Sequence, residues 1–211
     1  SKRGGKETIS LETIANDDVG VISRMPLKLS QAAKRTLYKF IFDFFRTNAT
    51  IYDTTALYTV GHGNLGTAAL SATSFAAGRL AMSKQAELDS AAPLGLILRH
   101  LAVPSDLLET AFDMFVRNTN NDETFVQSRK PMVHEIPYWT DANDWCGFAD
   151  KREIPLLEVG FYNGQEDPEL FIQDNPSQGS LFSNDQVTYK IRHIYSGAIP
   201  DFRGHYKGVV A

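Results

Sequence analysis

The sequence lacks the features that mark several large classes of protein. Its single cysteine, Cys146, allows no intrachain disulfide and no cysteine-rich metal site, and a reducing compartment is the simplest interpretation. Its longest apolar run, Leu37 to Phe45, is interrupted by Lys39 and Asp43 and is too short and too polar to cross a bilayer. Basic residues are not in excess either. The net charge of −4 argues against a protein whose main task is to neutralise nucleic-acid phosphates, although it is compatible with loose contact with DNA.

The composition is otherwise that of an ordinary globular protein. Hydrophobic residues make up 43% and charged residues 22% of the 211 positions, which suffices for one large or two small domains without disulfide or metal support. The chain begins at Ser1 without a methionine, and its first residues resemble neither a signal peptide nor a transit peptide. We therefore expect a fragment that begins inside a longer protein.

The first part of the chain predicts a strand followed by a long helix. Polar and apolar residues alternate from Thr8 to Ile14, which is the two-residue period of a strand with one buried face. The polar run Asn16–Asp18 then offers caps for a helix N-terminus. Apolar residues three and four apart indicate a long amphipathic helix, and they are Leu29, Ala33, Leu37, Phe40, Ile41, Phe44 and Phe45. We expect Leu37, Phe40 and Phe44 to be buried, and Pro26 to kink this helix or to mark where a second segment starts.

The remainder predicts a mixed middle and a strand-rich end. In the middle we expect a loop over 48–66, a small-residue helix over 68–85, a buried strand over 94–103 and a helix from Ser105 through Phe115. A polar loop over 118–131 then leads to strands over 132–136, 145–149 and 156–162. We expect a turn at 163–164 and further turns over 174–185. A last long strand places Val187, Tyr189, Ile191, His193 and Tyr195 on one face and Thr188, Lys190 and Arg192 on the other. We expect Lys190 and Arg192 to face solvent or another subunit. The order of these elements predicts an α+β fold in two joined lobes.

The best enzymatic candidate is the glycine loop Gly61–Gly66, which matches G-x-G-x-x-G and precedes a helical stretch. A dinucleotide site needs a buried strand before the first glycine and an acid at the end of the next strand. Residues 54–60 make a poor parallel strand, and Asp106, the acid after the next credible strand, lies about twice as far along as the roughly 20 residues expected. A chance match is therefore favoured, with a nucleotide-dependent enzyme kept as an alternative.

Cys146 is the second candidate for chemistry. It would act as a nucleophile with His134 and either Asp144 or Asp141, because a thiolate needs a base or a cation to lower its pKa. No catalytic-cysteine signature surrounds it, so a small packed residue within a strand is the favoured interpretation.

Metal ligands are not grouped along the sequence. The five histidines show no close pairing of the H-x-x-x-H kind, and they are His62, His100, His134, His193 and His205. The Asp141, Asn143 and Asp144 cluster has too few oxygens at calcium-loop spacing and is typical of a solvated turn. We expect no catalytic residue, no metal and no cofactor, and hence a protein that is not an enzyme.

Four stretches carry a resemblance to a known family. They are Asn16–Asp18 with Gly20, His62–Leu65, Leu101–Pro104 before a helix, and Asp201–Gly208. Each is short, but in this order they resemble the major capsid proteins of tailed phages, in particular the Mu-like major head subunit and the prohead-protease-fused capsid proteins of prophages. The resemblance covers nearly the whole chain.

The resemblance implies the Hong Kong phage-type capsid fold, with a peripheral domain built on a long spine helix and an axial domain around a central sheet. The expected divisions are residues 1–16 as a remnant of an extended loop, 17–69 as the peripheral domain with the spine helix, 70–150 as the axial domain, and 151–211 as remaining axial and peripheral strands. The N-terminal arm and the outgoing half of the extended loop are missing from this pattern. We therefore expect a monomer or small oligomer that does not close into shells. Some relatives crosslink a lysine to an asparagine between subunits, and Lys2 and Lys6 lie in the matching region, although no asparagine partner or catalytic acid can be identified.

The implied function is self-assembly into the icosahedral head that encloses phage double-stranded DNA. The implied partners are copies of the chain itself, with prohead protease, scaffold, portal and non-specific contact with packaged DNA, and no membrane. The implied location is the virion, after assembly in the bacterial host cytoplasm. An encapsulin-like nanocompartment shell is the alternative within the same fold.

Overall fold

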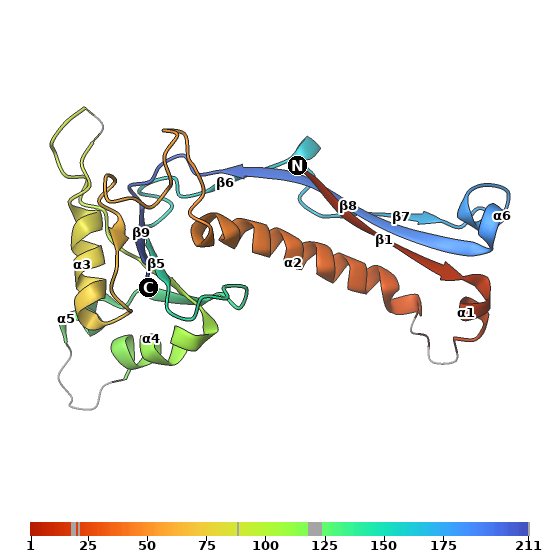
Figure 1. Cartoon of the computed structure of the whole chain (residues 1–211), viewed down its shortest axis with the longest axis horizontal. Helices are drawn as coiled ribbons and strands as arrows, with labels where there is room; N and C mark the ends of the chain where they lie inside the picture. Colours follow the sequence, from red (N-terminus) through yellow and green to blue (C-terminus); the bar gives the residue numbers. More distant parts are fainter. Residues whose placement is uncertain (18–19, 21, 88, 118–123, 211) are drawn as a thin grey trace. The chain divides into compact units, whose positions relative to one another are not determined.

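The computed structural model describes residues 1–17, 20, 22–87, 89–117 and 124–210, which belong to two compact units (Figure 1). The first unit consists of Ser1–Ile41 and Val159–Gly197, and the second of Phe42–Glu158 and Ala198–Ala211. Each unit combines helices with a sheet, so the predicted α+β class is confirmed.

The sheet of the first unit is built around the 13-residue strand β8 (Gln186–Ala198). Strand β1 (Lys2–Ser10) pairs antiparallel with one side of β8, from Lys2 opposite Ile194 to Ser10 opposite Gln186. Strands β7 (Glu169–Gln173) and β6 (Glu158–Phe161) also pair with β8, and the short helical turns η3 (Tyr162–Gly164) and α6 (Ser180–Asn184) lie between strands along the chain. The predicted long strand is confirmed, and so is its alternation, because Val187, Ile191 and Tyr195 are buried.

The predicted first strand ends earlier than the alternation of polar and apolar residues, which continues to Ile14. Ser10 accepts a hydrogen bond from the backbone N–H of Thr13 (3.3 Å) and caps helix α1 (Leu11–Ala15), so Leu11 to Ile14 are helical instead of extended. Asn16 ends α1, and Asp17 Oδ2 accepts from the backbone N–H of Ile22 (2.8 Å) at the 3-10 turn η1 (Ile22–Arg24). Asp18, the third predicted cap, lies outside the described residues.

Helix α2 (Met25–Arg46) runs for 22 residues and its last turn belongs to the second unit. Pro26 neither kinks nor interrupts it, because proline in a first turn removes a donor that has no acceptor there. Only Phe45 is fully buried in α2, whereas Leu37, Phe40 and Phe44 are half-buried, so these three are less buried than predicted. Phe40 packs against Tyr195 at 5.1 Å between ring centroids, and the Arg3 guanidinium lies over the Phe40 ring at 4.3 Å from its centroid.

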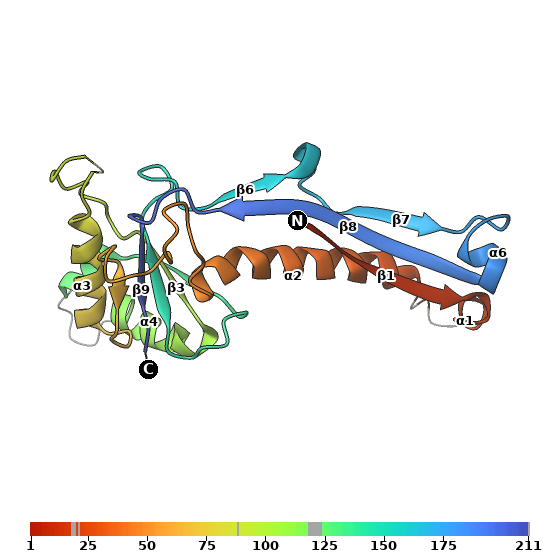
Figure 2. The ribbon, with the colours of Figure 1, turned by 45° about the horizontal axis from the view of Figure 1, so that its top comes forward.

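The second unit contains a mixed five-stranded sheet in the order β2 (Leu65–Gly66), β9 (His205–Gly208), β5 (Trp145–Phe148), β3 (His100–Val103) and β4 (Met132–Glu135). Its helical segments are α3 (Ala72–Ser83), η2 (Ser105–Leu107), α4 (Leu108–Phe115) and α5 (Phe125–Arg129), and Figure 2 shows α3 beside β9. Strand β3 is shorter than the predicted run over 94–103. Strand β9 and the short helices α5 and α6 lie where only loops, turns or a tail were expected, and residues 118–123 of the predicted polar loop lie outside the described residues.

Alternation along the central strands fills both faces of this sheet. Trp145 and Leu101 point into one hydrophobic cluster, and Cys146 and Ala102 into the other. The Trp145 indole N–H donates to the carbonyl of Ala68 (3.1 Å), so this fully buried ring has its polar atom satisfied. The second unit therefore has a hydrophobic core on both sides of its sheet.

Candidate assembly surface

The glycine loop Gly61–Gly66 is held by its own asparagine. Asn64 is almost fully buried; its amide donates to the carbonyl of Leu57 (2.8 Å), and its Oδ1 accepts from the backbone N–H of Thr59 (3.1 Å). The loop leads into the short strand β2 and not into a helix, since α3 begins at Ala72. No strand precedes Gly61 within residues 50–60, so the strand, turn and helix of a nucleotide site are not assembled here.

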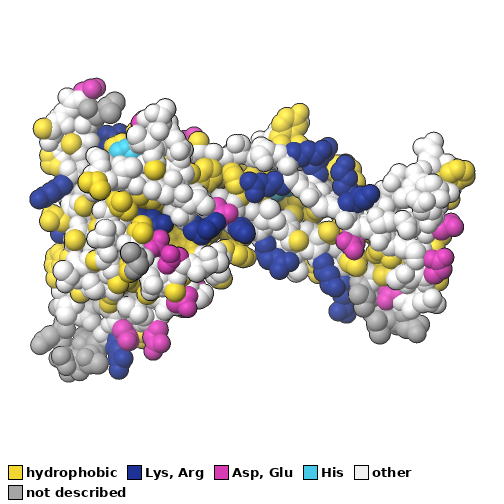
Figure 3. All heavy atoms as spheres, viewed as in Figure 1, with side chains coloured by type: hydrophobic (Ala, Val, Ile, Leu, Met, Phe, Trp, Pro, Cys, Tyr) yellow, Lys and Arg dark blue, Asp and Glu magenta, His cyan; other side chains and the backbone are white. Residues whose placement is uncertain are grey.

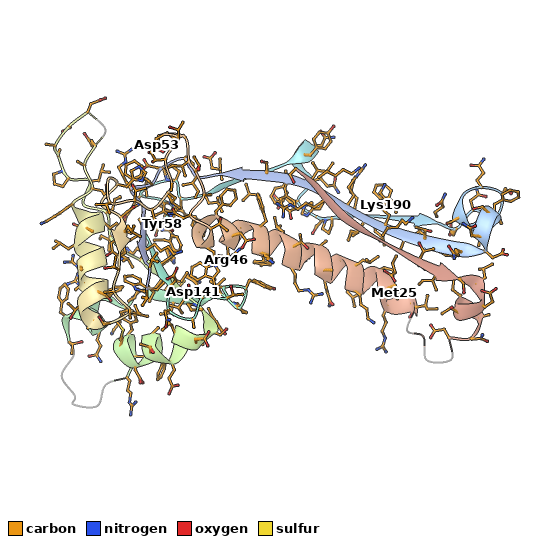
Figure 4. All side chains as sticks on the ribbon, in the orientation of Figure 1. Met25, Arg46, Asp53, Tyr58, Asp141 and Lys190 are labelled. Atoms are coloured by element: carbon orange, nitrogen blue, oxygen red, sulfur yellow. The ribbon has the colours of Figure 1, made fainter. Side chains whose placement is uncertain are left out.

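His62 serves the same loop as a packing residue. Its ring stacks on Phe202 at 3.9 Å between centroids, Nε2 lies 2.7 Å from Asp53 Oδ2, and Nδ1 lies 3.0 Å from the carbonyl oxygen of Leu57. Burial raises the pKa of Asp53, but hydrogen bonds from Thr55 and His62 outweigh it and hold that pKa below its usual value. Figure 4 labels Asp53, which lies in a loop of the second unit.

Cys146 is fully buried in β5, and the Tyr58 hydroxyl donates to its Sγ at 3.7 Å. Burial raises the pKa of this thiol to about 12, and the Lys207 ammonium lowers it only in part, so the nucleophilic thiolate is not accessible near neutral pH. The predicted partner Asp144 forms an ion pair with Lys207 at 2.9 Å, and His134 contacts His100 instead. The proposed catalytic constellation is therefore not brought together.

The sheet does bring two histidines together. His100 Nδ1 and His134 Nε2 are 3.1 Å apart on the parallel strands β3 and β4, a proximity that their separation in the sequence conceals. Burial and the neighbouring His100 lower the pKa of His134. No third ligand joins them, and the described residues contain no group of three or more His, Cys, Asp or Glu that could hold a metal ion. Asp141 instead accepts from the backbone N–H of Asn143 (3.0 Å), as in an ordinary turn.

The most distinctive surface of the first unit is positively charged. Lys2 and Lys6 on β1 share one face of the sheet with Lys190 and Arg192 on β8, opposite the buried apolar side chains. We call these four side chains, together with Phe171 on β7, the cationic face. Figure 3 shows Lys and Arg side chains gathered over the part of the first unit that β8 and α2 form. The predicted orientation of Lys190 and Arg192 away from the apolar face is confirmed.

Register places like charges side by side on this face. Lys6 is directly opposite Lys190 in the antiparallel ladder, where side chains of equal charge destabilise each other. Arg192 is compensated, because its Nε (2.9 Å) and Nη2 (2.6 Å) both donate to Glu169 Oε2. The Arg192 guanidinium lies over the Phe171 ring at 4.8 Å from its centroid, and the Lys190 ammonium lies 5.7 Å from the same centroid. Lys190 is labelled in Figure 4.

A glycine shapes the same face. Gly4 lies opposite Arg192, and a Cβ atom at this position would clash with the carbonyl oxygen of Ile191. A hollow of ≈ 450 Å³ borders Gly4 on this face and is lined by Lys2, Lys6, Lys190, Arg192 and the backbone between them. An anionic group can enter this hollow, because at least three ammonium groups border it and no carboxylate does.

The second unit carries a contrasting surface, which we call the acidic patch: Asp106, Glu109 and Glu135. All three are exposed, and the Ser105 hydroxyl donates to Glu135 Oε1 (2.7 Å), which ties the end of β4 to the start of η2. Exposed apolar side chains of the adjacent α4 and of its C-terminal cap face solvent beside it, with exposed fractions of 37% for Leu108, 54% for Phe112 and 63% for the cap residue Val116. Apolar side chains at a helical spacing of four are typical of a surface that another protein covers.

Comparisons with known proteins place this geometry in context. Among the described residues, no helix has the length and apolar character needed to cross a membrane. The chain is similar to solved structures from Microbacterium phage Oxtober96 (12% identity, TM-score 0.63, covering 100% of this chain and 72% of that chain) and Gordonia phage Cozz (15%, 0.57, 100% and 70%). It is also similar to the capsid of Myoviridae Phage XM1 (10%, 0.61, 100% and 73%).

These similarities confirm the predicted Hong Kong phage-type capsid fold. None of the curated proteins compared with the sequence matches it. A model of the phage capsid protein family matches residues 1–208, which run through both units. The chain therefore belongs to the phage capsid protein family, and it is a structural capsid subunit and not an enzyme.

Proposed function

We propose that copies of this chain tile the icosahedral head of a tailed phage or prophage and enclose its double-stranded DNA. The observation that carries this proposal is the extent of the family match, which includes both units. The exposed apolar side chains of α4 support it, because such surfaces need a partner to be shielded from water. The location that follows is the virion, after assembly in the cytoplasm of the bacterial host.

The finer assignment is to the Mu-like or prohead-protease-fused group of capsid proteins. It rests on the four sequence stretches described above, of which Asp201–Gly208 is the most telling. Strand β9 lies inside this stretch, and its Lys207 is buried in an ion pair with Asp144. Prohead protease, scaffold and portal would be the further partners of such a subunit, and packaged DNA a non-specific one.

Electron microscopy tests the proposal. The gene that encodes this chain would be expressed in a bacterial host, alone and with the protease encoded beside it, and the particles compared. Closed shells of uniform size are the expected result. A protein that stays monomeric under both conditions would contradict a shell function. Terminase, portal and prohead protease genes nearby would separate a phage head from an encapsulin-like nanocompartment.

A further inference from the structure

The cationic face carries charge that its own unit leaves uncompensated. Lys2, Lys6 and Lys190 take part in none of the ion pairs formed by the residues that the structure describes, whereas Arg192 is bound by Glu169. The opposition of Lys6 and Lys190 works against the pairing of β1 with β8 in the isolated chain. An anion bound between them would remove this repulsion, and the hollow beside Gly4 provides the space.

Two observations favour a protein partner over a nucleic acid. Phe171 is 41% exposed and lies under Arg192 and Lys190 within the face, and aromatic and Arg side chains are enriched in the cores of protein interfaces. The charge of the chain is also divided unequally. The second unit contains 16 acidic and 11 basic residues, a net charge of −5, whereas the first unit contains 9 acidic and 10 basic residues, a net charge of +1. Copies of the same chain thus supply the complementary surface.

The acidic patch is the surface of the second unit that fits best. Asp106, Glu109 and Glu135 take part in no ion pair among the described residues, while the nearby Asp113 is compensated by Arg117 at 3.3 Å. The exposed side chains of Leu108 and Phe112 lie on the same short segment as Asp106 and Glu109, and the Ser105 hydroxyl ties Glu135 of β4 to its start. The patch therefore offers both a charge opposite to that of the cationic face and apolar area for Phe171 to contact.

We propose that the cationic face of one copy binds the acidic patch of a second copy. This inference rests on the proposed function, because it assumes that the chain self-associates. The contact is heterologous, since the two surfaces differ, so each copy offers one of each and can join two neighbours. Heterologous contacts generate closed rings where the rotation closes, which is the arrangement that a capsid ring requires.

A charge exchange tests the contact. The first variant carries Lys6→Glu and Lys190→Glu, the second carries Asp106→Lys and Glu109→Lys, and sedimentation velocity measures association of each at about 50 mM and about 500 mM salt. The wild-type chain should associate more strongly at the lower salt concentration. Each variant alone should associate at least about tenfold more weakly, because like charges then meet across the contact. An equimolar mixture of the two variants, and a chain carrying all four substitutions, should both recover association.

The control variant has the same change in net charge, but at positions outside the proposed contact. Lys84→Glu with Lys151→Glu alters two exposed lysines of the second unit and should leave association within about twofold of wild type, because surface charges outside a contact contribute little. Circular dichroism of every variant establishes that it is folded. This makes loss of association in one variant, and its return on mixing, independent of folding defects.

Three results would overturn the inference. One is a wild-type chain that stays monomeric at low salt up to its solubility limit. The second is a Lys6→Glu, Lys190→Glu variant that associates like wild type but loses binding to a labelled DNA duplex, which would assign the face to nucleic acid. The third is a gene with these two substitutions that builds wild-type shells in the host, which would reject this contact and leave the proposed function standing.

Discussion

Protonation of His205 is expected to govern the acid sensitivity of the second unit. His205 lies on β9 with 1% of its surface exposed and packs against the rings of Phe45 and Phe148, whose centroids are each 5.5 Å from the imidazole and 4.8 Å from each other. Its Nε2–H donates to the carbonyl of Leu156 (3.0 Å), so Nδ1 carries the lone pair of the neutral ring. Nδ1 is buried without a hydrogen-bond partner among the described residues, so an added proton would have no acceptor.

The size of the effect follows from the pKa in the two states. Burial lowers the pKa of His205 to about 4, against an ordinary value of 6.5. Between these values the unfolded chain binds a proton that the folded chain does not, so the free energy of unfolding decreases as the pH falls from 6.5 to about 4. At about 1.4 kcal/mol per pH unit, the total loss is about 3 kcal/mol, a large part of the roughly 5–15 kcal/mol that stabilises a typical protein.

Urea unfolding between pH 7 and pH 4 measures this loss. His205→Phe keeps a ring packed against Phe45 and Phe148 but cannot titrate, and it leaves the Leu156 carbonyl without its donor at a cost of about 1–3 kcal/mol near pH 7. The variant should therefore be less stable than wild type at pH 7 and should lose this disadvantage as the pH falls. His134→Gln, at an exposed position, is the control and should keep most of the wild-type slope. Equal slopes for wild type and His205→Phe would refute the reasoning.

Three further changes have defined outcomes. Phe40→Ala should lower the free energy of unfolding by about 2 kcal/mol in urea titration. This is below the roughly 3–5 kcal/mol of a fully buried ring, because Phe40 is only half-buried. A loss of about 3–5 kcal/mol would show that the Phe40 ring is covered in solution. Gly208→Ala should cost about 1–3 kcal/mol because its Cβ would meet Trp145 Cε2 at 2.6 Å, whereas Gly160→Ala, with open space around it, should stay within about 0.5 kcal/mol. Calorimetry with NAD, FAD or ATP at millimolar concentration should give no binding heat at Gly61–Gly66, and a saturable micromolar isotherm would contradict the structural role of this loop.

Local periodicity predicted the elements whose side chains repeat regularly. The long helix α2 and the alternation of β8 follow from spacings of three to four and of two residues, which need no knowledge of the rest of the chain. Their ends were less well predicted, because a single hydrogen bond decides them. The Ser10 side chain caps α1 and overrides an alternation that continues to Ile14.

The candidate surface could be predicted only in part. The positions of Lys190 and Arg192 on one face followed from alternation, but the opposition of Lys6 and Lys190 depends on the register between the two ends of the chain. Strand β9 was missed for a related reason. Its residues His205 and Lys207 are buried by long-range partners, although their side chains are typical of a solvated tail.

Charged and apolar side chains would contribute differently to the proposed contact. An exposed ion pair contributes only about 0–1 kcal/mol, so Lys6 and Lys190 alone cannot hold two copies together. A persistent interface needs more than about 1,000 Å² of complementary surface, and Phe171 with Phe112 can supply some of its apolar part. Opposite charges mainly fix the orientation of approach and exclude wrong pairings. Because each copy would make the contact once through the cationic face and once through the acidic patch, a modest orientation preference is repeated at every subunit. Salt should therefore change the rate and accuracy of assembly more than the stability of a finished shell.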